Sequence, residues 1–408
     1  MSMETHKKVS RHIIVTEMLE ELSRTILANK RESLAEPQIA WFHHIRGIQP
    51  VRYRPEYNLW EVFSYKEVQQ VLLDYTTFSV DKCVPEGFPG ALGISDPPEY
   101  LQIRNLVSKA FTPRSIEELT PRLIQIVDEL LEGASTSGKM NVATEFAHRL
   151  PGRVITEILG LPLEDQERFQ QWATQLYDQL VGIGVPNHTE MLQYFSNRLH
   201  ERKCDPRDDL MSELLAAKEN GAHVTHEEIV HLCLDIMMAA NATVPNLLTC
   251  TLQHFCRHPE TYQTLRNDPS LIPGAIEETL RCGFNMMNAW RTTRHDTMLG
   301  GQEIKAGQYV VAWVGAANFD ETYFPQASRF DIRRSPNPHL TFGYGAHVCL
   351  GSALARLEGR IALERIITHF SDIRPDLGKP LQLLDNKSKY FRVLLTPAAS
   401  SASFFLPH

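Results

Sequence analysis

The sequence has little cysteine, and none of it is spaced as a C-x-x-C pair. Seven cysteines are scattered over 408 residues, an odd number without the spacing of a disulfide framework. Reduced thiols are the rule inside cells, whereas disulfides mark secreted proteins. The cysteine pattern therefore favours a cytoplasmic protein.

The sequence also lacks an excess of positive charge. It has 41 lysines and arginines against 49 aspartates and glutamates, for a formal net charge of −8. A general nucleic-acid binder usually carries a basic face, so this balance argues against that class without excluding a local basic patch. The 43% hydrophobic and 22% charged residues are ordinary for a globular protein, and the length allows a substantial core.

Long apolar runs and targeting signals are missing from the first 35 residues. A membrane-spanning helix needs about 20 apolar residues, and a secretory signal needs an apolar segment before a small-residue cleavage site. We therefore expect residues 1–35 to form a polar tail that leads into an amphipathic helix, with no membrane anchor. No repeat or low-complexity linker divides the chain, so we expect one domain over residues 1–408.

The hydrophobic pattern predicts a mainly helical fold with a smaller β-rich portion. The stretch "PVRYRPEYNLWEVFSY" alternates around a turn at residues 55–58 and predicts a hairpin. Short strands are expected between residues 290 and 314. Residues 83–100 are rich in proline and glycine and predict a long loop, which is often functional in a compact domain.

A long apolar helix is predicted over residues 225–258. It opens with a capping box from Thr225 to Glu228 and stops at His258, which precedes a proline. At 1.5 Å per residue its apolar part would be about 45 Å long, enough to cross a whole domain. Too many polar residues interrupt this segment for a membrane span.

The segment "HLTFGYGAHVCLGSALARLE", residues 339–358, places Cys349 just before a helix expected from about residue 350 to 370. The free N–H groups and positive dipole end of a helix start favour an anion, and such a position lowers the pKa of a thiol. Gly343, Gly345 and Gly351 have no Cβ, so a flat group can lie close above the chain. A single cysteine without local metal partners suits the axial position of haem iron better than zinc, which takes about four protein ligands. The plain alternative is a free structural cysteine in a tight turn.

The motif "FGYGAHVCLG" resembles the haem-binding signature of cytochrome P450 monooxygenases of the soluble bacterial type, with Phe342, Gly345, Cys349 and Gly351 at its fixed positions. The segment "DPPEYLQIRNLVSKAFTP" resembles the helix that runs past the haem edge in that family. The resemblance covers nearly the whole chain, from about residue 38 to 395.

The resemblance implies a triangular prism of helices around heme b, iron protoporphyrin IX. The residues that it places around this cofactor are Tyr100, Arg104, Ala239, Ala240, Arg291, Phe342, Gly343, His347, Cys349 and Gly351, with Cys349 as the metal ligand. Haem propionates need cations or hydrogen-bond donors in a largely apolar pocket, and the matching positions are Arg104, Arg291 and His347. Tyr100 stands where the family usually has histidine, and its hydroxyl can donate a hydrogen bond but brings no charge.

A second motif, "ETLR", supplies the Glu-x-x-Arg pair of the family, Glu278 and Arg281. In isolation it would be an ordinary surface pair one helical turn apart. The resemblance implies a buried ion pair that braces the haem-side core, and Arg329 in "QASRF" is expected to be its third member.

The long helix departs from the family pattern Ala-Gly-x-(Asp/Glu)-Thr, since residues 239–243 read "AANAT". Thr243 matches the threonine that hydrogen-bonds dioxygen and helps to deliver protons. A threonine that bonds back to an earlier carbonyl loosens a helix locally, and Pro245 removes a backbone donor, so a kink is expected. Ala242 replaces the proton-relaying acid. Protons then have three possible sources, which are water organised by Asn241 and Asn246, a relay through Glu358, or the substrate itself.

The regions that the family uses for substrate are apolar here and favour a lipophilic terpenoid, steroid, fatty acid or macrocycle. The candidate substrate contacts are Phe88, Leu92, Asp235, Met238, Met286 and Met287. Methionine adapts to irregular shapes. Asp235 is the polar exception, and it either anchors an amine or hydroxyl of the substrate or turns toward solvent or an arginine.

We expect a monomeric monooxygenase that receives electrons from NAD(P)H through a separate ferredoxin and reductase. Four basic residues near the thiolate are candidates to dock an acidic ferredoxin, or else are structural: Lys109, Arg114, Arg356 and Arg360. The missing acid at position 242 motivates a rival, a peroxide-driven haem peroxygenase. A non-catalytic haem-binding or ligand-sensing protein is the third possibility.

Overall fold

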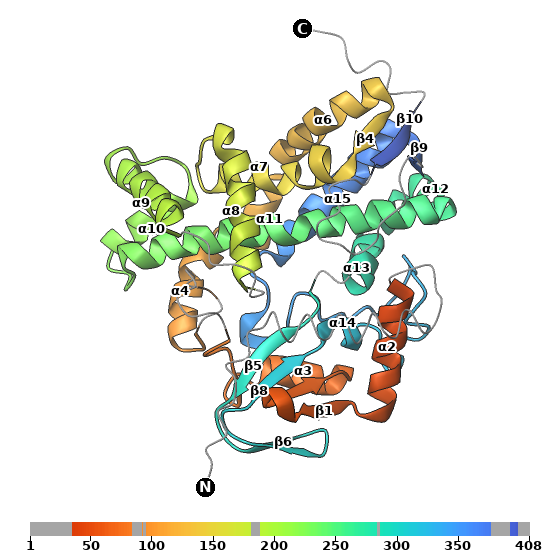
Figure 1. Cartoon of the computed structure of the whole chain (residues 1–408). Helices are drawn as coiled ribbons and strands as arrows, with labels where there is room; N and C mark the ends of the chain where they lie inside the picture. Colours follow the sequence, from red (N-terminus) through yellow and green to blue (C-terminus); the bar gives the residue numbers. More distant parts are fainter. Residues whose placement is uncertain are drawn as a thin grey trace.

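A computed structural model of the chain describes residues 35–83, 92, 95–180, 188–283, 286–376 and 392–398 (Figure 1). The helices are α2 (Ala35–Ile48), α3 (Tyr65–Leu73), α4 (Glu99–Ser108), α5 (Pro113–Glu117), α6 (Thr120–Ser137), α7 (Arg149–Ile158), α8 (Gln166–Leu180), α9 (His188–Cys204), α10 (Leu210–Glu219), α11 (His226–Arg257), α12 (Pro259–Asn267), α13 (Ile272–Cys282), α14 (Val314–Ala317) and α15 (Ser352–His369). The strands are β1 (Val51–Arg54), β2 (Leu59–Val62), β3 (Phe78–Ser79), β4 (Lys139–Asn141), β5 (Ala289–Thr293), β6 (Thr297–Leu299), β7 (Gln302–Ile304), β8 (Tyr309–Ala312), β9 (Phe370–Pro375) and β10 (Arg392–Pro397). The expected balance of many helices and a smaller β portion is confirmed.

The largest sheet has the order β1-β2-β8-β5-β3, in which β2 and β8 are parallel and the other neighbours antiparallel. The predicted hairpin is confirmed as β1 and β2, with Val51 opposite Val62. Its turn closes through Asn58, which has a left-handed φ of 51°, a conformation that asparagine tolerates well. Two smaller sheets have the orders β4-β10-β9 and β6-β7.

The predicted long helix is α11, and it lies between a helical part with α6, α7 and α9 and a sheet-rich part with β1, β5 and β8 (Figure 1). Its capping box is confirmed: Thr225 Oγ1 accepts from the Glu228 N–H at 3.1 Å, and Glu228 Oε2 accepts from the Thr225 N–H at 2.7 Å. The helix continues through Pro245. Among the described residues it is the one helix long and apolar enough to span a membrane, but 61% of its most apolar window is buried inside the domain, as in a core helix.

The crossing of α11, α13 and α15 forms the centre of the main apolar core. Gly359 makes the close approach possible, since a Cβ there would lie 2.8 Å from Ile276 Cδ1 and 3.4 Å from Leu247 Cδ2. A side chain at this position would displace the ends of these two side chains from the packed core. The sequence thus packs the helix that follows Cys349 directly against α11.

Candidate active site

The loop that carries Cys349 is a tight turn folded against the end of α3. Gly343 and Gly345 have φ angles of 74° and 76°, a region that residues with a Cβ avoid. A Cβ on Gly345 would also lie 3.0 Å from Leu73 Cα. The Cys349 N–H donates to the Phe342 carbonyl at 2.7 Å, which closes the loop three residues before α15 begins.

The Cys349 thiol is surrounded densely by protein, yet the residue has an exposed side. Burial raises the pKa of this thiol, while the Gly351 N–H and the guanidinium groups of Arg104 and Arg356 act in the opposite direction. The expected lowering is therefore wrong for the free thiol, because desolvation outweighs the effect of the helix start. A metal cation bound to the sulfur is what makes a thiolate stable in such surroundings.

Arg291 is a buried cation that forms no ion pair with any described residue. It lies on β5 with 7% of its surface exposed, and its Nη1 donates to the Trp290 carbonyl at 2.7 Å. Within the described part of the chain no carboxylate oxygen lies within 4.0 Å of its guanidinium, and burial lowers the pKa of Arg291. A buried guanidinium without a paired carboxylate is costly, so this position suits an anion that the described residues do not supply.

Three other predicted haem contacts lie close together at the start of α4. Arg104 donates to the Tyr100 hydroxyl, which leaves the hydroxyl proton of Tyr100 for another acceptor. The Tyr100 ring lies 4.3 Å from the His347 imidazole, centroid to centroid. His347 Nε2 in turn lies 3.0 Å from Asp96 Oδ1. The sequence analysis did not predict a role for Asp96. Its position directly before the two prolines of "DPPEY" could have suggested one.

These residues fit heme b. A Cβ on Gly351 would meet no atom within 4 Å, so there is open space for a flat group at this residue, two positions after Cys349. Cys349 offers a single soft ligand, and the described residues hold no cluster of three or more His, Cys, Asp or Glu side chains suited to another metal. The unpaired charge of Arg291 matches the need of a haem propionate.

The middle of α11 has an accessible face although the helix is largely buried. Ala239 and Thr243, one helical turn apart, are exposed, and Ala240 and Ala242 are partly buried. Thr243 Oγ1 donates to the Ala239 carbonyl at 3.1 Å, the back-bonding that the sequence predicts. This face leaves the middle of α11 accessible to a bound group.

Asn241 does not belong to this accessible face. It is 6% exposed, its Nδ2 donates to the Met237 carbonyl at 2.8 Å, and its Oδ1 lies beside Gly152 of α7. Two residues of an α-helix differ by about 200° around the axis, so Asn241 points away from the side of Ala239 and Thr243. The suggestion that it organises water for proton delivery is wrong for this geometry.

Glu358 is a buried carboxyl on α15. It is 1% exposed, its Oε2 has no hydrogen-bond partner among the described residues, and burial raises the pKa of Glu358 to about 8. No cation or donor compensates for the desolvation. The group therefore keeps its proton near neutral pH, as a proton donor must.

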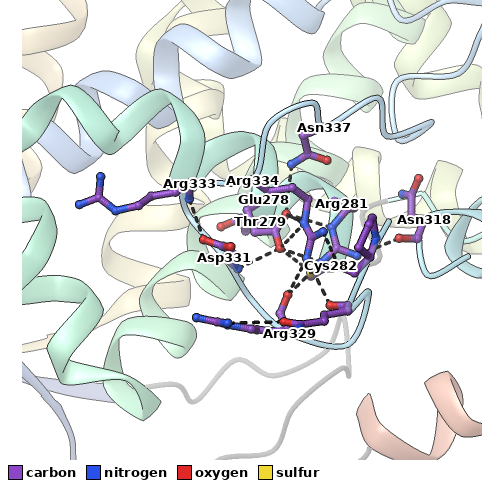
Figure 2. A network of polar contacts seen from close by, with 12 residues as sticks. Glu278, Thr279, Arg281, Cys282, Asn318, Arg329, Asp331, Arg333, Arg334 and Asn337 are labelled. Carbon is purple, nitrogen blue, oxygen red and sulfur yellow. Dashed lines mark hydrogen bonds and ion pairs between the residues drawn. The ribbon is translucent and has the colours of Figure 1, made fainter. Parts of the chain in front are cut away.

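Glu278 and Arg281 form the expected buried ion pair, and both side chains are 0% exposed (Figure 2). Arg281 Nη2 donates to Glu278 Oε1 at 2.7 Å and its Nε donates to Oε2 at 2.9 Å. The third arginine is Arg334, whose Nε lies 3.1 Å from Glu278 Oε2. Although burial opposes ionisation, these hydrogen bonds and charges hold the pKa of Glu278 below its usual value.

Arg329 is not the third member that the sequence suggests. Its side chain is exposed and contacts Gln326 at 3.5 Å, while its backbone carbonyl accepts from Arg281 Nη2 at 3.3 Å and from Arg334 Nη2 at 3.1 Å (Figure 2). Arg329 thus joins the network through the main chain. The sequence analysis overlooked the neighbouring arginines at 333–334, the second of which binds Glu278.

Asp235 binds the backbone N–H of Leu92 rather than pointing to solvent. Its Oδ2 accepts from the Leu92 N–H at 2.7 Å, and the residue is 7% exposed. The role of substrate anchor is therefore not supported, because this oxygen already has a donor.

The other predicted substrate contacts lie in three places. Met238 packs at the edge of the main core, whereas Met286 and Met287 pack against two different apolar clusters on the sheet side. Phe88 lies outside the described residues.

The four basic residues near the thiolate side are mostly paired. Arg356 makes two hydrogen bonds to Glu277, at 2.7 and 2.9 Å, and its guanidinium lies 4.5 Å from the Phe342 ring centroid. Arg360 pairs with Glu117 at 3.1 Å. Arg114 pairs with Glu118 at 3.2 Å, and Lys109 has no carboxylate within 4.0 Å in the described regions. The structural alternative therefore holds for Arg356.

The helical fold, the single-cysteine loop and the surroundings of Arg291 define a haem-thiolate protein. A family model described as Cytochrome P450 matches residues 174–399. Putative cytochrome P450 YjiB of Bacillus subtilis is 34% identical over 370 residues, which cover 86% of this chain and 91% of the relative. Erythromycin C-12 hydroxylase of Saccharopolyspora erythraea is 36% identical over 351 residues, which cover 82% and 88%.

Among solved structures, CYP109E1 from Bacillus megaterium in complex with testosterone has a TM-score of 0.80 and 31% sequence identity, and the match covers 88% of this chain and 97% of that one. The chain belongs to the cytochrome P450 family. It is a cytochrome P450 monooxygenase whose cofactor is heme b, and the resemblance that the sequence suggests is confirmed.

Proposed function

We propose that this enzyme inserts one atom of dioxygen into a lipophilic small molecule, with electrons from NAD(P)H delivered by a separate ferredoxin and reductase in the cytoplasm. We further propose that the whole chain acts as one monomeric domain. The observation that carries the proposal is the accessible pair Ala239 and Thr243 on an otherwise buried α11, in a chain whose Cys349 also has an exposed side.

Heme b, when bound, supplies dioxygen activation and oxygen-atom transfer. In the proposal Cys349 is its metal ligand, and Gly351 leaves room for the flat macrocycle. Gly343 provides the positive φ that the turn of the loop needs. Arg291 binds a propionate, since its buried charge has no ion pair among the described residues. The Tyr100–Arg104 pair and His347 supply further donors on the same side.

Thr243 supplies the hydroxyl nearest to the chemistry. Its proton is held by the Ala239 carbonyl at 3.1 Å, so the hydroxyl oxygen is free to accept a hydrogen bond. With Ala242 in place of an acid, the proposed reservoir of protons is Glu358, because a carboxyl with a pKa of about 8 holds a transferable proton at neutral pH. Water or a substrate hydroxyl would complete the route.

The proposed substrate class is lipophilic because the described positions expected to contact substrate are apolar or already bonded. Leu92, Met238 and Met286 are partly buried apolar side chains, and the Asp235 carboxylate is engaged by a backbone N–H. The names of the relatives agree with bulky apolar skeletons, since one is an erythromycin hydroxylase and one was solved with testosterone. We propose a macrocycle or steroid as the first compounds to test.

The experiment is a substrate screen by the shift of the ferric Soret band, followed by turnover of each hit. Each hit is incubated with ferredoxin, reductase, NADPH and oxygen, and separately with hydrogen peroxide. The proposal predicts more product with the electron-transfer proteins, and a loss of coupling in Thr243→Ala. Product formed with peroxide alone would favour the peroxygenase, and ligand binding without turnover in either arm would favour a sensor.

A further inference from the structure

Asp96 is a buried carboxylate that joins four segments of the chain. It is 3% exposed and lies just before α4. Its Oδ2 accepts from the Ser79 hydroxyl at 2.6 Å, from the Val80 N–H at 3.3 Å and from Arg294 Nη2 at 3.0 Å, after the end of β5. Its other oxygen, Oδ1, faces His347 in the loop that carries Cys349. A buried carboxylate with this many donors is strongly fixed in position.

The contact with Asp96 decides which nitrogen of His347 is available. A carboxylate only accepts hydrogen bonds, so Nε2, 3.0 Å from Oδ1, is the nitrogen that donates. Nδ1 is then the one nitrogen left for a further partner. The Tyr100 ring, 4.3 Å away, restrains the imidazole from one face. Two independent contacts therefore fix both the orientation and the free edge of the ring.

We propose that Asp96 is a positioning residue that presents Nδ1 of His347 to a haem propionate. Asp96 acts through His347 and does not touch the cofactor itself. The same carboxylate also binds Arg294, which directly follows β5. The inference rests on heme b as the cofactor and on His347 as one of its contacts, and not on the substrate or the electron donor.

Asp81 offers a matched control. Its Oδ2 lies 3.0 Å from Nη2 of Arg294, the same nitrogen that binds Asp96 at the same distance. The Asp81 side chain is 50% exposed, whereas that of Asp96 is 1% exposed. No contact of Asp81 with His347 is present in the described part of the chain. Asp81→Asn therefore removes a carboxylate from Arg294 without disturbing the histidine.

The test measures how fast ferric holoenzyme transfers its haem to an excess of apomyoglobin, together with its reduction potential. Asp96→Asn weakens a charge-assisted hydrogen bond, so haem release is expected to be about tenfold faster or more. Asp81→Asn is expected to stay within about twofold of wild type, as surface changes do. Asp96→Glu keeps the carboxylate and is expected to recover part of the loss.

A double variant separates positioning from general support of the fold. If Asp96 acts through His347, haem release from Asp96→Asn/His347→Ala is no faster than from His347→Ala alone, and both single variants shift the reduction potential in the same direction. Full additivity in the double variant would overturn the proposal. So would a wild-type release rate for His347→Ala, a result that stands even if Asp96→Asn does not fold. None of these measurements needs substrate or turnover, so a wrong function would leave them unaffected.

Discussion

Glu358→Gln changes the protonation chemistry of the buried carboxyl on α15 with little change of shape. The carboxyl is 1% exposed, and burial raises its pKa from the usual 4.5 to about 8. Between these two pH values the folded protein keeps the proton, whereas the unfolded chain loses it. The unfolded state then binds fewer protons, so the free energy of unfolding falls as pH rises through this range. Glutamine is neutral at every pH and removes this dependence.

The magnitude follows from the two pKa values. The full difference between the folded and unfolded pKa of Glu358 corresponds to about 5 kcal/mol of unfolding free energy. The change in unfolding free energy between pH 5 and pH 8 is about 3 to 4 kcal/mol of this. We therefore expect the stability of Glu358→Gln relative to wild type to increase by about that amount from pH 5 to pH 8. The wild type should be the more pH-sensitive protein.

The assay is guanidinium unfolding of both ferric proteins at pH 5, 6, 7 and 8, with stability differences taken from the midpoints at a common slope. Glu364→Gln is the control, because Glu364 lies on the same helix with 38% of its side chain exposed and pairs with Arg360 at 3.4 Å. A constant difference between Glu358→Gln and wild type over this range would refute the reasoning. It would mean that the carboxyl is already ionised in the folded protein.

Three further experiments, with four variants, test other parts of the site. Ala242→Asp restores an acid on α11 and should raise the fraction of NADPH electrons recovered in product at least about twofold; unchanged coupling would show that the missing acid does not limit proton delivery. Arg334→Ala removes a donor from the buried carboxylate of Glu278 and should cost about 2 to 3 kcal/mol of unfolding free energy, whereas Arg329→Ala should stay within about 0.5 kcal/mol by the same denaturant measurement. Equal losses in the two would contradict the assignment of the third arginine. Arg291→Met should release haem to apomyoglobin about tenfold faster, and a wild-type rate would remove it from the propionate site.

The sequence was most informative where local chemistry decides the structure. The hairpin at 51–62, the capping box at Thr225 and the turn at Gly343 and Gly345 follow from residues close together in the chain. Each depends on a backbone preference or a short-range hydrogen bond that the sequence shows directly. The motif around Cys349 then identified the family, which the matched relatives confirm.

Predictions failed where contacts between distant segments decide. Arg334 rather than Arg329 reaches Glu278, because the loop between α14 and α15 turns the side chain of Arg334 inward. Asp235 is bonded to Leu92, 143 positions away in the chain. Neither the Arg334–Glu278 contact nor the Asp235–Leu92 contact can be predicted from the spacing of residues in the sequence. The same holds for the Cys349 thiol, since its pKa depends on how much protein surrounds the sulfur as well as on its place before a helix.

The central claim is that the Cys349 sulfur binds the iron of heme b, and the most direct measurement is the absorption spectrum of the reduced protein with carbon monoxide. The account predicts the long-wavelength Soret band that thiolate ligation gives, and its loss in Cys349→Ala. A spectrum like that of a globin from fresh, folded wild-type protein would contradict it, as would an unchanged thiolate band in the variant.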